Sequence, residues 1–152
     1  MSDTSKQSSG VILLVEDNHM DVILAKKGFE EVAPAIKLHN VDNGVQALSF
    51  LRRTGQYVDA PTPDLVLLDL NMPLMDGRET LAEITRDEKL QHIPVVILTN
   101  SQFDDDVRSA YKMRASSYIR KPVDFDDFLQ IAKGIVAYWF HLVVLPNHHR
   151  GA

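Results

Sequence analysis

Short apolar runs without a polar interruption constrain the fold of this chain more than any other feature. The clearest are VILLV at 11–15, LVLL at 65–68 and PVVIL at 94–98. A strand that is apolar on both faces is typical of a parallel sheet covered by helices on either side. Residues 36–41 and 117–119 are weaker strand candidates, which we expect nearer the sheet edges.

Segments with helical periodicity separate these runs. Apolar residues recur at steps of three or four over 22–32, 45–51 and 81–90, and a more polar segment over 104–113 is a fourth candidate. A fifth begins near Asp124, a good N-cap residue. Its expected buried residues are Phe128, Ile131, Ala132, Ile135 and Trp139. Five strand–helix pairs predict an α/β fold, a doubly wound, flavodoxin-like parallel sheet of five strands in the order 2-1-3-4-5.

Composition limits the kind of protein. We expect a disordered leader over residues 1–10, one domain over 11–146 and a flexible tail over 147–152 of this 152-residue chain. The absence of cysteine excludes disulfides, thiolate metal sites and cysteine nucleophiles. A net charge of -5 argues against a nucleic-acid partner. No apolar run approaches the roughly 20 residues of a membrane helix, so we predict a soluble, cytoplasmic protein with no membrane contact.

The ends of the predicted strands carry the residues best suited to chemistry. The carboxyl ends of parallel strands meet at one edge, where doubly wound folds bind their ligands. The residues that lie there are Glu16, Asp17, Asp69, Asn71, Thr99 and Lys121. Carboxylates gathered at one edge repel each other unless a cation lies between them. A ligand set made only of oxygen is typical of a hard divalent ion, and we therefore predict Mg²⁺.

The same edge is unsuited to nucleotides but suited to a phosphoryl group. Glu16 and Asp17 stand where nucleotide-binding and flavin-binding folds place a loop rich in Gly or Ser, and their charges repel phosphate. With Mg²⁺ bound, the acidic residues instead receive a phosphoryl oxygen. Asp69 is then the natural nucleophile, Lys121 pairs with the incoming charge, and Thr99 donates a hydrogen bond to a phosphoryl oxygen.

Four motifs occur in order at these strand ends: LLVEDN at 13–18, LLDLNMPLMDG at 67–77, ILTNS at 97–101 and YIRKP at 118–122. With them the chain resembles the CheY-like receiver domain of two-component response regulators. The resemblance implies phosphoryl transfer from a kinase phosphohistidine to Asp69. It also implies that Mg²⁺ is held by Asp17, Asp69 and the backbone carbonyl of Asn71, with Glu16 reaching it through water. Two further implications are a cis bond between Lys121 and Pro122, and a switch in which Tyr118 swings inward when Thr99 moves toward the phosphoryl group and changes the face of helix 4, strand 5 and helix 5.

A narrower resemblance rests on DGRETLAEI at 76–84, the long connection at 52–64 and YWFHLVVLP at 138–146. These segments are similar to the small regulators that work with bacterial phytochrome kinases. The expected partner is therefore a sensor histidine kinase of the phytochrome type. The apolar tail suggests a homodimer through the fifth helix, and the alternative is a monomer in which the tail folds onto its own domain.

Other interpretations stay open at this stage. Taken singly, Asp17 and Asp69 could be capping or surface residues, Thr99 a strand residue, Lys121 a solvated lysine, and Tyr118 a half-buried strand residue with its hydroxyl in water. An aspartyl-phosphate phosphatase is a second function, although such enzymes carry an Asp where this chain has Asn71. A degenerate receiver that only binds partners is a third. We favour a signalling domain, not an enzyme, whose only chemistry is its own phosphorylation and slow dephosphorylation.

Overall fold

A single parallel sheet forms the centre of the computed structural model, which describes residues 9–100 and 104–146. Its five strands run in the order β2-β1-β3-β4-β5, as predicted. Their bounds are β1 Gly10–Val15, β2 Ile36–Val41, β3 Leu65–Leu68, β4 Val95–Thr99 and β5 Ser117–Arg120. The three central strands are buried along nearly their whole length, which explains why each is an uninterrupted apolar run.

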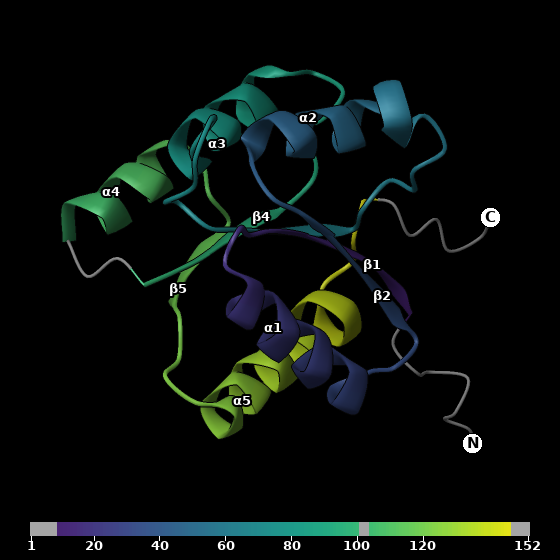
Figure 1. Ribbon diagram of the computed structural model, residues 1–152, viewed down its shortest axis with the longest axis vertical. Helices are drawn as coiled ribbons and strands as arrows, with labels where there is room; N and C mark the ends of the chain where they lie inside the picture. Colours follow the sequence, from purple (N-terminus) through teal and green to yellow (C-terminus); the bar gives the residue numbers. More distant parts are fainter. Residues whose placement is uncertain (1–8, 101–103, 147–152) are drawn as a thin grey trace.

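Helices cover both faces of the sheet (Figure 1). The helices α1 and α5 lie on one face, and α2, α3 and α4 lie on the other. Their bounds are α1 His19–Val32, α2 Gly44–Arg52, α3 Gly77–Arg86, α4 Asp104–Lys112 and α5 Phe125–Ile135. A short 3-10 turn, η2 (Gly55–Tyr57), follows α2.

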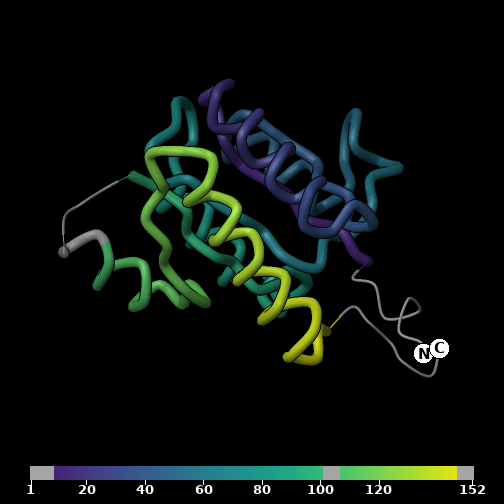
Figure 2. The backbone as a smooth tube through the Cα atoms, turned by 90° about the horizontal axis from the view of Figure 1, so that it is seen from below, coloured from purple at the N-terminus to yellow at the C-terminus, as the bar shows by residue number. Residues whose placement is uncertain are grey.

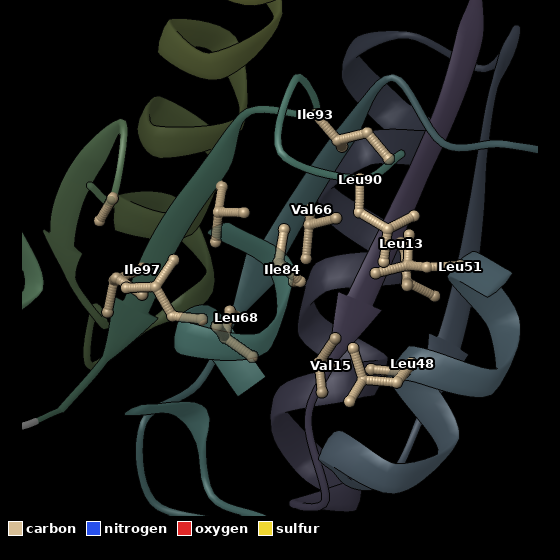
Figure 3. Close-up of a cluster of buried hydrophobic side chains, with 14 of the residues drawn as sticks. Leu13, Val15, Leu48, Leu51, Val66, Leu68, Ile84, Leu90, Ile93 and Ile97 are labelled. Carbon is tan, nitrogen blue, oxygen red and sulfur yellow. The ribbon is translucent and has the colours of Figure 1, made fainter. Parts of the chain in front are cut away.

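Alternate side chains of each central strand point to opposite faces of the sheet and pack in two separate hydrophobic cores. Ile12 and Leu14 pack under α1 and α5, whereas Leu13 and Val15 pack under α2 and α3. Figure 3 shows the second core, where side chains from the sheet, from α2 and α3 and from the chain before β4 converge. In the first core α1 and α5 lie side by side (Figure 2), and the rings of Phe29 and Phe128 meet edge to face at 5.9 Å.

Local expectations differ from the structure at two helices. The periodicity predicted a helix reaching Leu90, but α3 ends at Arg86, and Leu90 is buried from the turn that follows. Helix α2 keeps Leu48 and Leu51 in the core, whereas Val45 is exposed. The predicted start of the fifth helix is confirmed, because α5 begins after the cap Asp124, whose side chain accepts a hydrogen bond from the backbone N–H of Asp127.

The chain after α5 continues as a π-helical segment, η3 (Val136–Leu142), that folds back on the domain. Phe140 packs so closely on Gly10 that an added Cβ there would lie 2.7 Å from its ring. Leu145 is also buried, whereas Tyr138, Leu142 and Val144 are exposed. The tail thus covers part of its own domain and leaves a second apolar face open.

The sheet begins one residue before the predicted start of the domain at residue 11. Gly10 already pairs with Ile36 as part of β1. The rest of the predicted leader, except Ser9, and the predicted tail over 147–152 lie outside the described residues. Among the helices that are described, none has the length and apolar character needed to cross a membrane.

Candidate functional site

Three carboxylates gather at the carboxyl edge of the sheet. Glu16 and Asp17 follow β1 directly, and Asp69 follows the neighbouring strand β3. One carboxylate oxygen from each residue lies within 4.8 Å of the others. Glu16 and Asp69 are buried, whereas Asp17 is exposed. The sequence-based prediction that these three residues meet is confirmed, and the cluster is open to solvent on the side of Asp17.

Hydrogen bonds to the neighbouring strand fix the end of β1. The backbone N–H of Glu16 donates to the carbonyl of Val41 at 3.0 Å. The side-chain amide of Asn40 donates to the Glu16 carbonyl at 3.1 Å and to the Leu14 carbonyl at 3.0 Å. The Glu16 carboxylate in turn accepts from the backbone N–H of Asn18 at 3.0 Å. Both backbone polar groups of Glu16 and its carboxylate are therefore fixed by hydrogen bonds at the end of β1.

Lys121 supplies the positive charge of the site. It follows β5, and its backbone N–H donates to the carbonyl of Thr99 at 2.8 Å. The side-chain nitrogen lies 2.6 Å from Glu16, 2.8 Å from Asp21 and 3.6 Å from Asp69. The predicted meeting of Lys121 with Asp69 is confirmed, but its two shorter contacts are to other carboxylates.

Burial and charge shift the pKa values of this pair. Burial raises the pKa of Glu16 to about 7, the negative charge of Asp69 acts in the same direction, and the hydrogen bond from Lys121 opposes them. Burial by itself lowers the pKa of Lys121, but hydrogen bonds to Asp21 and Glu16 outweigh it and raise the pKa to about 12. The ammonium therefore stays charged at neutral pH.

The loop after β3 places Asp69 against the start of α3. The backbone N–H of Asp69 donates to the carbonyl of Val15, and that of Asn71 donates weakly to the Asp69 carboxylate at 3.4 Å. Gly77 begins α3 directly against this strand end, since a Cβ on it would lie 2.2 Å from the carbonyl oxygen of Asp69. Asp76 closes a capping box with Glu79 and so fixes where the helix begins.

Two buried hydroxyls lie near the edge without a hydrogen-bond partner among the described residues. They belong to Thr99, the last residue of β4, and to Tyr118 on β5. The simpler interpretation of Tyr118, with its hydroxyl in water, is therefore wrong. An unpaired buried hydroxyl is costly, so both groups are available to partners that arrive from outside the described residues.

One expectation about the backbone is wrong. No peptide bond between described residues is cis, and this includes the bond between Lys121 and Pro122. The trans isomer is the lower-energy one for a residue before proline, by roughly 0.5–1 kcal/mol. Lys121 reaches the acidic residues from a trans bond, so nothing in the arrangement demands the other isomer.

Asp21 also contacts Lys121 in this site, although it was not among the residues predicted from the strand ends. It lies in the first turn of α1 rather than at a strand end. Its backbone N–H donates to the side chain of the N-cap residue Asn18 at 3.1 Å. The signal was present in the sequence, because a side chain three residues after an N-cap points back toward the start of its helix.

The donor set defines what the site can do. Three carboxylates with oxygen-only chemistry suit a hard divalent cation. A lysine beside Asp69 and a buried hydroxyl on the next strand suit an incoming oxyanion. The arrangement can thus receive a phosphoryl group at Asp69 with its charge neutralised from two directions.

Comparison with known proteins identifies the family. The response regulator receiver domain matches residues 12–133. The chain is 40% identical to Response regulator Rcp1 of Synechocystis over 146 residues, which cover 96% of this chain and 99% of that protein. It is also 40% identical to the probable methanogenesis regulatory protein FilR2 of Methanothrix harundinacea over 129 residues, covering 85% and 83% of the two chains.

Solved structures agree with this result. The phosphorylated cyanobacterial phytochrome response regulator RcpA is similar with a TM-score of 0.86 and 40% identity, over 91% of this chain and 99% of that one. The Mn²⁺-bound form of Rcp1 is similar with a TM-score of 0.83 and 39% identity, over 90% and 99%. The chain therefore belongs to the response regulator receiver domain family, whose members bind a divalent metal and signal through phosphorylation.

Proposed function

We propose that this chain accepts a phosphoryl group on Asp69 from a phytochrome-type histidine kinase, in a Mg²⁺-dependent reaction in the cytoplasm. The observation that carries the proposal is the position of Asp69, which is buried, lies within 4.8 Å of two other carboxylates and is 3.6 Å from the Lys121 ammonium. A nucleophilic carboxylate that lies beside both a cation site and a fixed ammonium fits phosphoryl transfer better than any other chemistry.

The residues divide the work of the transfer. A carboxylate oxygen of Asp69 attacks the phosphorus, the P–N bond of the phosphohistidine breaks, and the imidazole leaves with the electron pair. Asp17, Asp69 and the Asn71 carbonyl would hold Mg²⁺, with Glu16 acting through water, and the metal would supply charge neutralisation. Lys121 pairs with the phosphoryl charge, and the buried Thr99 hydroxyl donates to a phosphoryl oxygen.

The proposed output is a change on the face formed by α4, β5 and α5. Thr99 gains a partner when it turns toward the phosphoryl group, and the Tyr118 ring follows into the space that it leaves. Both hydroxyls lack partners among the described residues, which supports a second arrangement of the pair. Hydrolysis of the phosphoaspartate then resets the domain slowly.

The partner kinase is inferred from the relatives and from the surface around the site. RcpA is a cyanobacterial phytochrome response regulator, and it is similar to this chain over nearly its whole length. Three large apolar side chains near the carboxyl edge are exposed, Met20, Leu74 and Val123. Val123 is 95% exposed and follows Lys121 closely in the chain. Such side chains offer a kinase apolar contacts beside the reacting carboxylate.

A labelling experiment tests the proposal. We expect the chain to gain one phosphoryl group from acetyl phosphate when Mg²⁺ is present and none in excess EDTA, as measured by intact mass, with the label on the peptide that contains Asp69. Phosphotransfer from a phytochrome kinase should be at least tenfold faster than from unrelated histidine kinases. A label on another residue contradicts the acceptor, and equal rates from all kinases contradict the partner.

We further propose that the open face of the tail joins two copies of the chain. Tyr138, Leu142 and Val144 are exposed in this part of the chain, and Tyr138 also lines a groove of about 450 Å³ between β5 and α5. We expect a dimer by sedimentation, and Leu142→Ser should raise the dissociation constant at least tenfold. The control is Val58→Ser, because Val58 is also an exposed apolar residue but is distant from Leu142 in the sequence, and this variant should dimerise like the wild type. A wild-type chain that sediments as a monomer at every concentration contradicts the proposal.

A further inference from the structure

The Lys121 ammonium is shared unequally among three carboxylates. Its distances to Glu16 and Asp21 are 2.6 and 2.8 Å, which are hydrogen-bond distances, whereas Asp69 lies at 3.6 Å. An ammonium has three donors, and two of them are therefore engaged away from the nucleophile. Glu16 and Asp21, rather than the proposed nucleophile Asp69, therefore hold the Lys121 side chain in place.

Asp21 is fixed in place but is not part of the acidic cluster. The cap of α1 orients it, since its backbone N–H donates to the Asn18 side chain. Its side chain is 32% exposed, compared with 10% for Lys121 and 2% for Glu16. Among the described residues, the group of carboxylates that could hold a metal comprises Glu16, Asp17 and Asp69, without Asp21. The hydrogen bond that Asp21 accepts from Lys121 links it to the site.

We propose that Asp21 is a positioning residue that holds Lys121 away from Asp69 until a phosphoryl group competes for the ammonium. The inference rests on the proposed function and deepens it, because it names what sets the resting position of the lysine. Three phosphoryl oxygens on Asp69 attract the ammonium more strongly than one carboxylate does. The contact between Lys121 and Asp21 then lengthens, and the cost of breaking it slows phosphorylation.

The variant Asp21→Asn tests this idea, because it removes the charge and keeps the shape. We expect phosphorylation by acetyl phosphate in Mg²⁺ to become about three- to tenfold faster and phospho-Asp69 to live longer, in line with the loss of a weak to moderate ion pair. The matched control is Asp127→Asn. Asp127 occupies the same position after the N-cap of α5 as Asp21 does in α1, and both donate a backbone N–H to the capping side chain. Its rate should equal that of the wild type.

A spectroscopic readout separates positioning from a structural effect. We expect the ¹⁵N signal of the Lys121 ammonium to differ between wild type and Asp21→Asn before phosphorylation, and to converge once both are phosphorylated. Unchanged rates, or signals that differ as much after phosphorylation as before, overturn the inference. If wild-type Asp69 takes no label, the proposed function fails instead, and with it the reaction on which Asp21 would act.

Discussion

Asp69→Asn abolishes phosphoryl labelling of this chain, with an expected fall in rate of at least 100-fold. The neutral amide has nearly the shape of the carboxylate, so it fits between β3 and α3, but its oxygen is a poor nucleophile. The substitution also removes one of the carboxylates that would hold Mg²⁺. The rate with acetyl phosphate, followed by intact mass, measures the effect.

The control for this variant is Asp42→Asn. Asp42 is exposed after β2, and its backbone N–H, which the substitution keeps, donates to Gln46. Its labelling should match that of the wild type. Labelling of Asp69→Asn at the wild-type rate would move the acceptor to another residue, and the exposed carboxylate of Asp17 is the nearest alternative in the cluster.

The sheet could be predicted because strands buried on both faces consist almost entirely of apolar residues. Val66 and Leu67 point to opposite faces of the sheet, and both are fully buried. The strand that contains them, β3, therefore has no polar residue. Parallel pairing then follows, and it brings the strand ends together at one edge. Because these four residues follow strands of one parallel sheet, the topology was sufficient to predict a shared site for Glu16, Asp17, Asp69 and Lys121.

What the sequence did not predict depends on contacts between distant side chains. The end of α3 at Arg86 could not be separated from its continuation to Leu90, because Leu90 is buried in either case. Asp21 was missed because it lies in the first turn of α1, whereas the prediction considered only residues that follow the strands. The tail kept two alternatives open, because an apolar sequence does not say which side chains meet Gly10 and which remain exposed.

Gly77→Ala has the largest expected effect on stability. An added Cβ would lie 2.2 Å from the Asp69 carbonyl oxygen and 2.6 Å from the Leu70 Cα, both of which are backbone atoms at the end of β3. These atoms cannot rotate away as a side chain would, and the N–H of Gly77 is itself bonded to the Leu70 carbonyl at 2.9 Å. Either α3 moves off the sheet or the strand end moves. We expect the free energy of unfolding to fall by about 3 kcal/mol, at the upper end for overpacking.

Urea denaturation measures the effect, and Gly134→Ala provides the matched control. A Cβ on Gly134 meets nothing within 4 Å, and the residue lies on an exposed part of α5. Alanine favours a helix over glycine by about 1 kcal/mol, so the same substitution should raise stability there. Because the clash in Gly77→Ala falls on the backbone of Asp69, the part of that variant that folds should also label more slowly. A loss of stability below 1 kcal/mol would mean that the strand end yields easily, and the close approach of α3 would then not be what fixes Asp69 in the site.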